Sequence, residues 1–452
     1  MRFVYLPLVG ILLVLFFRVF HALAKRDAML TPILGWTVGL GFFLLVPLTI
    51  IAVNGGYESP NFYDVNGSRA NVNLSTIESM PAFVMIWAAL LLSLVSVLLF
   101  LPKLKSGWRR REFVLNDTSL KRTIYVTVFL AVVDYIVSIY IAGGLAQFLV
   151  SHWYLRAEDM VTTLGDRYVL YAWLMQANQT VFTAAAVLFT HSQARKGTVN
   201  WRFHFFLIVV LLFHVVFSGN RIFLALYVIS LLVSCLLYGR SKVVVILLTA
   251  APVLALTFSA WAYFRSAPTE IVANIPVYMN ADLGNRTATV LMDAFDGSDT
   301  VLLFHIVNDF GEKYDLLYGS SYLRSLSFIV PRSIYPERAS GFQLQLAEKY
   351  EPGETTSLAA TQLGELYANF GPLSVLLLPL LTLMIMFGSE AGIGWIAEHA
   401  ITSSVVFVLI IWTVRSTFED NFITFLAALV IIRALRLERS VYSTPAGPTC
   451  EV

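Results

Sequence analysis

A series of long apolar runs, each close to the length that crosses a lipid bilayer, dominates this sequence. A membrane-spanning helix needs roughly 20 mostly apolar residues. Of the 452 residues, 58% are hydrophobic and only 13% are charged, and the mean hydropathy is +0.73. Because these values lie well outside the range of soluble domains, the chain is predicted to be a polytopic membrane protein.

The predicted fold class is an all-α polytopic membrane protein with about 11 transmembrane helices and one long loop. The candidate spans cover residues 3–20, 33–53, 81–101, 123–142, 169–190, 203–219, 222–238, 243–263, 372–388, 400–414 and 420–433. They divide the chain into a helical region (1–263), a long loop of mixed polarity (264–371), a second helical region (372–433) and a tail (434–452). In this arrangement the two cysteines, at positions 235 and 450, form neither a disulfide framework nor a metal site.

The distribution of basic residues predicts the orientation. One alternating set of segments between spans holds 18 of the 31 Lys and Arg residues, and cytoplasmic segments of membrane proteins are enriched in these residues. The N-terminus and the long loop are therefore expected outside the cytoplasm, and the C-terminus inside it. A cleaved signal peptide ending at Ala22-Leu23-Ala24 is the alternative for the first span. Arg18, within the apolar run, opposes that alternative.

The long loop carries motifs that a simple bilayer anchor would not need. They are Pro331-Arg332, Tyr335-Pro336-Glu337-Arg338 and Gly364-Glu365-Leu366-Tyr367-Ala368-Asn369-Phe370-Gly371. The last motif is expected in a helix that is capped by Thr355 or Thr356 and ends at Gly371. Residues 286–315, which are acidic with apolar clusters, are expected to form short amphipathic helices at the membrane face, and a further apolar run at 321–330 leads into Pro331.

The order of these motifs resembles that of the oligosaccharide repeat-unit polymerases, the Wzy-type O-antigen polymerases. Ser218-Gly219-Asn220-Arg221, at an outer turn, is similar to a turn of the same family, and the resemblance covers about residues 220–420. It implies a GT-C-like glycosyltransferase of the bacterial inner membrane with its active site on the periplasmic side. Such an enzyme moves an oligosaccharide from undecaprenyl diphosphate onto a lipid-linked repeat unit. Membrane lipid and a chain-length regulator are the implied further partners, whereas nucleic acid and a cofactor are not expected.

A leaving diphosphate requires fixed cations. Arginine suits this task because its planar head donates two parallel hydrogen bonds to phosphate oxygens and stays charged. Arg332 and Arg338 are therefore assigned to catalysis. The residues assigned to substrate binding are Arg221, Arg265, Arg324, Arg415, Asn369, Tyr335 and Tyr367. The alternative is that the arginines contact solvent or lipid headgroups and that the aromatic residues belong to an interfacial belt.

Displacement at a sugar carbon also needs a base for the attacking hydroxyl. Glu365 is the first candidate because it shares one polar helix face with Gln362 and Asn369. A salt bridge to one of the arginines is the structural alternative for this carboxylate. The rival bases are Asp309, Glu312, Glu337, Glu419, Asp420 and His305. For His305, which lies in an apolar run, packing is the expected role.

Two ionisable residues, Asp134 and His214, fall near the middle of predicted spans. They either pair to fix helix packing or indicate a second class of function, a proton-coupled transporter or a lipid-linked oligosaccharide flippase. Transporters usually place their determinants at the midplane on broken helices, whereas the motifs here gather in one outer loop. Two further alternatives are an O-antigen ligase-type transferase, which uses the same donor with another acceptor, and a non-catalytic assembly partner.

Three aspartates, Asp293, Asp296 and Asp299, recur at every third position of the long loop. Carboxylate oxygens are the ligands that divalent cations such as calcium prefer. A coordinating loop usually needs a denser set of oxygen ligands than this spacing provides. No metal site is therefore predicted.

Overall fold

A computed structural model of the chain describes most of the predicted spans and part of the long loop. The described residues are 2–26, 30–63, 69–76, 79–103, 116–153, 166–198, 200–218, 222–238, 292, 297–327, 341–350, 359–391 and 399–437. The predicted span at 243–263 lies outside these ranges.

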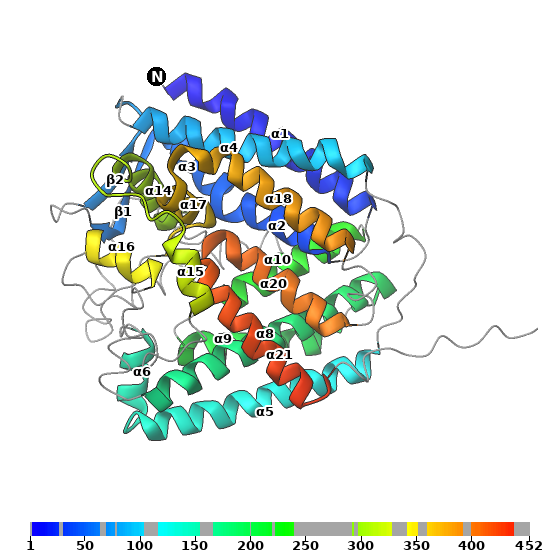
Figure 1. Cartoon of the computed structure of the whole chain (residues 1–452). Helices are drawn as coiled ribbons and strands as arrows, with labels where there is room; N and C mark the ends of the chain where they lie inside the picture. The colour runs from blue at the N-terminus through cyan, green and yellow to red at the C-terminus, as the bar shows by residue number, and fades with distance from the viewer. Residues whose placement is uncertain are drawn as a thin grey trace, which may run out of the picture.

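Helices that run side by side, most of them long, form the body of the protein (Figure 1). They are α1 (Arg2–Arg26), α2 (Pro32–Leu40), α3 (Val46–Asn54), α4 (Ser79–Phe100), α5 (Asp117–Ile141), α6 (Leu145–Trp153), α8 (Asp166–Lys196), α9 (Trp201–Ser218), α10 (Ile222–Leu237), α18 (Ser374–Ala391), α20 (Ala400–Arg415) and α21 (Phe418–Ala434). A π-helical turn, Gly41–Leu45, joins α2 to α3. Apart from 243–263, every predicted span overlaps a helix in the described chain, and some of these helices extend up to six residues beyond the predicted ends.

Six helical stretches in the described chain are long and apolar enough to cross a membrane, and three shorter apolar helices accompany them. The six are Val4–Lys25, Pro32–Asn54, Ser79–Lys103, Asp117–Ile141, Trp201–Ser218 and Gln362–Ser389. The predicted helical membrane architecture is therefore confirmed in its coarse form.

Besides its helices, the described chain forms one β-hairpin. Strand β1 (Gly56–Tyr63) pairs antiparallel with β2 (Arg69–Asn73) directly after α3. Gly55 ends α3 in the left-handed conformation at φ 73°, which glycine adopts without the penalty of a Cβ atom. This hairpin lies between the predicted spans 33–53 and 81–101, and no strand was predicted there.

Helices α2 and α20 pack closely because α2 carries two glycines on the shared face. A Cβ atom on Gly35 would lie 2.9 Å from the carbonyl oxygen of Phe407, and one on Gly39 would lie 2.7 Å from a methyl group of Val414. Small residues let two helix backbones approach in this way within membrane proteins. The contact fixes α20, and thereby the turn at Arg415 that leads into α21.

Four shorter helices occupy the described part of the long loop, and they gather with the hairpin at one end of the bundle (Figure 1). They are α14 (Gly297–Asp309), α15 (Ser320–Ser327), α16 (Phe342–Tyr350) and α17 (Gln362–Phe370). The expected membrane-face position of α14 is not what the structure shows, because its apolar residues Val301, Leu303 and Ile306 are fully buried. Thr300, also on α14, donates a hydrogen bond of 3.2 Å to the carbonyl oxygen of Phe43. This helix is thus packed into the protein core.

Candidate functional site

The motif that begins at Gly364 lies on α17, but the helix starts later than predicted. Its N-cap is Thr361, whose hydroxyl accepts a 3.2 Å hydrogen bond from the Gly364 backbone N–H. A cap at Thr355 or Thr356 was expected, and both lie outside the described residues; the chain at 359–361 is not helical. The predicted end at Gly371 is confirmed, with φ at 57°. The side chains of α17 are therefore held on one short, capped helix.

Glu365 is completely buried and joins three segments of the chain. One carboxylate oxygen accepts a 2.8 Å hydrogen bond from the Ser321 hydroxyl on α15. The other accepts a 3.0 Å hydrogen bond from the backbone N–H of Phe418, the first residue of α21. Backbone N–H groups at a helix N-terminus have no partner within the helix and favour negative charge. The α21 terminus and Ser321 therefore both stabilise an ionised Glu365.

Asn369 extends this arrangement by one turn of α17. Its side-chain N–H₂ donates to the Ser321 hydroxyl at 2.9 Å and to the Glu365 backbone carbonyl at 2.7 Å. Its side-chain oxygen accepts from the Gly319 backbone N–H at 2.9 Å. We call Glu365, Ser321, Asn369 and the Phe418 N–H the Glu365 cluster. The prediction that Glu365 and Asn369 share one polar face is confirmed, and that face points toward α15.

Gln362, the third residue of this face, also contacts α15. Its side-chain N–H₂ donates a 2.8 Å hydrogen bond to the Tyr322 hydroxyl. Burial raises the pKa of the Tyr322 phenol well above its usual range, and the nearby Glu365 carboxylate raises it further. Tyr322 is stacked against Phe370, with ring centroids 6.2 Å apart. A neutral hydroxyl and an amide thus lie next to the Glu365 cluster.

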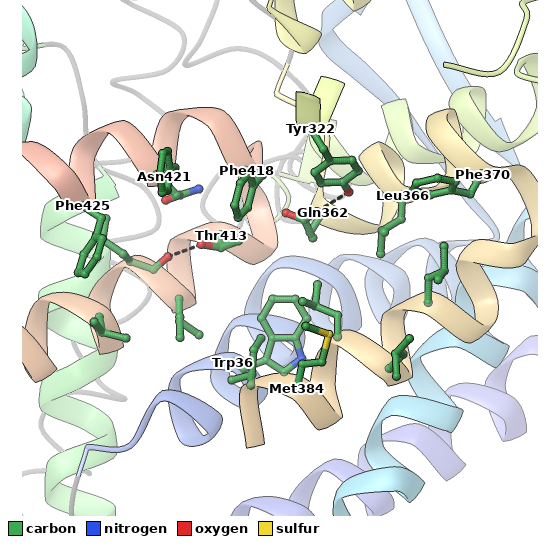
Figure 2. A pocket seen from close by; sticks show the side chains of 18 residues that line it. Trp36, Tyr322, Gln362, Leu366, Phe370, Met384, Thr413, Phe418, Asn421 and Phe425 are labelled. Atoms are coloured by element: carbon green, nitrogen blue, oxygen red, sulfur yellow. Dashed lines mark hydrogen bonds between the residues drawn. The ribbon is translucent and has the colours of Figure 1, made fainter. Parts of the chain in front are cut away.

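A cavity of about 610 Å³ lies beside the cluster, between α15, α17, α18, α20 and α21. Most of its wall is apolar, and Gln362 and Tyr322 line its edge together with Phe370 (Figure 2). Figure 2 shows Trp36 and Met384 across the open space from these residues. The volume falls within the range of roughly 300–1,000 Å³ that is typical of ligand pockets.

Arg415 and Asp299 form an ion pair of 3.0 Å that joins the end of α20 to the start of α14. Arg415 was predicted to bind substrate, and Asp299 was weighed as a metal ligand. Asp293 and Asp296 lie outside the described residues, and within those residues no group of three or more His, Cys, Asp or Glu side chains could hold a metal ion. Asp299 thus pairs with Arg415, the cation that precedes α21.

The structure describes only some of the predicted site residues. Arg324 lies on α15, three positions after Ser321, and is 9% exposed. Tyr367 is buried on α17. Outside the described residues lie Arg221, Arg265, Arg332, Tyr335, Glu337 and Arg338, and the side chains of Glu419 and Asp420 are not described either.

Among the rival bases, His305 has the packing role that was expected. Its ring contacts that of Tyr350 edge-on, with centroids 6.4 Å apart. The Asp309 carboxylate lies near the same tyrosine, where burial and then this carboxylate raise the pKa of the Tyr350 phenol above its usual range. Glu312 is exposed in the turn that follows α14. None of these three side chains has a described hydrogen bond to the Glu365 cluster.

Ser321 and the N-terminus of α21 were not predicted as parts of this site. Ser321 is 44 positions from Glu365, and Phe418 is 53 positions away. Ser320 and Ser321 are the first two residues of a short helix, where serine is common for reasons of capping alone. The sequence signal was the position of this helix between the motifs at 218–221 and 331–332. That position does not identify which hydroxyl contacts the Glu365 carboxylate.

A second group of buried polar side chains lies among α5, α8 and α9, apart from the Glu365 cluster. The Tyr135 hydroxyl is 2.7 Å from Nδ1 of His214 and accepts a 2.7 Å hydrogen bond from Gln179. Asp134 and His214 were considered as a possible pair, and the described contact of His214 Nδ1 is to the neighbouring Tyr135. His214 Nε2 is buried with no hydrogen-bond partner among the described residues.

Comparison of the chain with models of protein families, with curated proteins and with solved structures finds no match. The functional argument for this protein therefore rests on the geometry of its own residues and on the motifs of its sequence.

Proposed function

We propose that this protein is a membrane glycosyltransferase that extends a polysaccharide by transferring a lipid-diphosphate-linked oligosaccharide chain onto a lipid-linked repeat unit. The observation that carries the proposal is the position of Glu365, which is buried in a hydrogen-bonding cluster directly beside an apolar cavity. An enzyme that joins lipid-linked sugars needs a carboxylate and a lipid-compatible surface next to each other.

In the proposed reaction, the acceptor hydroxyl oxygen attacks the sugar carbon that carries the lipid diphosphate. A new carbon–oxygen bond forms, and the bond from that carbon to the diphosphate oxygen breaks. Glu365 takes the hydroxyl proton, and the electron pair of the broken bond leaves on the lipid diphosphate. The described hydrogen bonds from Ser321 and from the Phe418 N–H hold the two carboxylate oxygens of Glu365 in place for this role.

The proposal includes the finer architecture expected from the sequence. It comprises about 11 spans, a GT-C-like arrangement and an active site on the periplasmic face of the bacterial inner membrane. Arg324 supports a cationic site at this end because it lies on the helix that supplies Ser321 and Tyr322. In the proposal, Arg332 and Arg338 hold the leaving diphosphate.

Deletion of the gene, followed by analysis of the surface glycan, tests this function. A polymerase deletion is expected to remove long chains and to leave single repeat units on their final acceptor. Loss of every repeat unit would instead indicate the ligase-type transferase or the flippase. Restoration of long chains by the wild-type gene is the control.

The buried contact of Tyr135 with His214 favours one second candidate, a proton-coupled transporter or lipid-linked oligosaccharide flippase. For that function, substitution of His214 by Gln would abolish movement of lipid-linked sugars across proteoliposome membranes. For a transferase, the same variant would keep its turnover on substrate supplied from outside. Transport and transfer assays of one purified protein therefore separate the two candidates.

A further inference from the structure

The cavity beside the Glu365 cluster opens toward the outer surface of the helical bundle. Leu380 and Met384 of α18 both line it, and they are 52% and 63% exposed. They lie in Gln362–Ser389, one of the stretches long and apolar enough to cross a membrane. With this stretch across a membrane, such an opening would face lipid and would admit hydrocarbon chains sideways from the bilayer.

The opposite edge of the cavity carries two polar atoms that have no partner in the described structure. They are the side-chain oxygens of Gln362, which is 2% exposed, and of Asn421, which is 6% exposed. Both residues line the cavity and are labelled in Figure 2. A buried amide oxygen without a hydrogen bond costs on the order of 1–3 kcal/mol. Their presence indicates a ligand that brings hydroxyl or amide N–H groups to this edge.

The cavity edge and the Glu365 cluster share the same short segments of chain. Gln362 and Leu366 line the cavity and flank Glu365 on α17. Phe418 contributes its ring to the cavity and its N–H to the Glu365 carboxylate. A molecule with its chain in the cavity therefore presents its polar end beside that carboxylate.

We propose that this cavity holds the isoprenoid chain of the donor substrate, with the sugar hydroxyls nearest the chain bonded to Gln362 and Asn421. The assignment to the donor rests on the proposed function and on the reaction geometry. In the donor, the reacting sugar carbon is bonded directly to the lipid diphosphate, so the chain begins beside the reaction centre. In the acceptor, the reacting hydroxyl lies a whole repeat unit away from its own lipid.

The test is photolabelling of the full-length protein in nanodiscs with a lipid-linked repeat unit that carries a diazirine on its isoprenoid chain. A diazirine-bearing phosphatidylethanolamine is the second probe. Met384→Trp narrows the opening of the cavity, and Leu376→Trp is its matched control. Leu376 lies on the same helix, is also 63% exposed and does not line the cavity.

Labelling by the isoprenoid probe is expected on α18 and α20. Met384→Trp is expected to reduce this labelling about tenfold relative to Leu376→Trp, which corresponds to a loss of about 1.4 kcal/mol in binding free energy. Met384→Trp is also expected to raise KM for the donor while kcat stays within about twofold. Gln362→Met, which keeps the side-chain length and removes the amide, is expected to raise KM in the same direction. Equal labelling of the two Trp variants, or equal labelling by the phospholipid probe, would overturn the proposal.

The outcomes also separate this inference from the proposed function. Specific labelling of the cavity without any sugar transfer would contradict the transferase and leave the lipid site standing. Sugar transfer at a normal rate without labelling of the cavity would contradict the lipid site and leave the transferase standing.

Discussion

Ser321 donates a 2.8 Å hydrogen bond to the Glu365 carboxylate, and this contact ties α15 to α17 across 44 positions of sequence. Ser321 also accepts a hydrogen bond from Asn369, so a single hydroxyl connects the charged residue to the end of its own helix. Burial makes these contacts strong and their loss costly. The position of Glu365 is thus fixed by the polar contacts of its neighbours as well as by apolar packing.

Replacement of Ser321 by Ala is expected to destabilise the protein by about 1–3 kcal/mol, because buried partners at Glu365 and Asn369 lose a hydrogen bond. The measurement is thermal unfolding in detergent, followed by intrinsic fluorescence. Ser320→Ala is the matched control, since Ser320 begins the same helix and is exposed. Equal midpoints for the two variants would contradict the described contacts.

The ion pair between Arg415 and Asp299 allows the role of the arginine to be tested against its partner. If Arg415 binds diphosphate, Arg415→Ala lowers chain extension by about 100-fold at normal protein level, a typical effect of removing one contact to developing charge. Arg415→Lys is expected to retain little chain extension, because lysine lacks the forked guanidinium that binds two phosphate oxygens at once. Asp299→Asn keeps the cation and is expected to retain most of the activity.

Chain extension and protein level in each variant separate the two roles. Full activity in Arg415→Ala would leave only the structural role of the ion pair. The same loss of activity at normal protein level is expected for Ala at Arg221, Arg332 and Arg338, which are the other cations assigned to the diphosphate.

The predicted orientation is tested by cysteine labelling in intact cells. A membrane-impermeant maleimide is expected to label Glu312→Cys, in the exposed turn after α14, and to miss Lys103→Cys, at the exposed end after α4. Cys235→Ser combined with Cys450→Ser supplies a background without native cysteines. Labelling at position 103 but not at position 312 would reverse the orientation and remove the periplasmic active site.

Local rules predicted the elements that depend on neighbouring residues. The apolar runs gave the positions of the helices, and Gly371 ends α17 because glycine tolerates the positive φ that this turn requires. The shared face of Glu365 and Asn369 followed from helical periodicity. These features need only a short stretch of sequence to specify them.

Features that depend on distant contacts were not predictable in this way. Glu365 accepts hydrogen bonds from a serine in one distant helix and from the first backbone N–H of another, and Arg415 pairs with an aspartate from a separate segment. The position of α14 inside the core also depends on packing against α3, α4 and the hairpin. Periodicity identifies which face of a helix is apolar, but it does not identify what covers that face.

The most direct test of the central claim is polymerisation of purified lipid-linked repeat units by wild-type protein and by Glu365→Gln in nanodiscs. Turnover is measured per folded molecule, with folding checked by gel filtration and thermal unfolding. The wild type is expected to form chains of several repeat units, and Glu365→Gln is expected to lose about 100-fold or more in rate, because an amide cannot accept the hydroxyl proton. Near-wild-type turnover by folded Glu365→Gln would contradict the assignment of this residue as the base, and absence of chains with the wild type would contradict the polymerase itself.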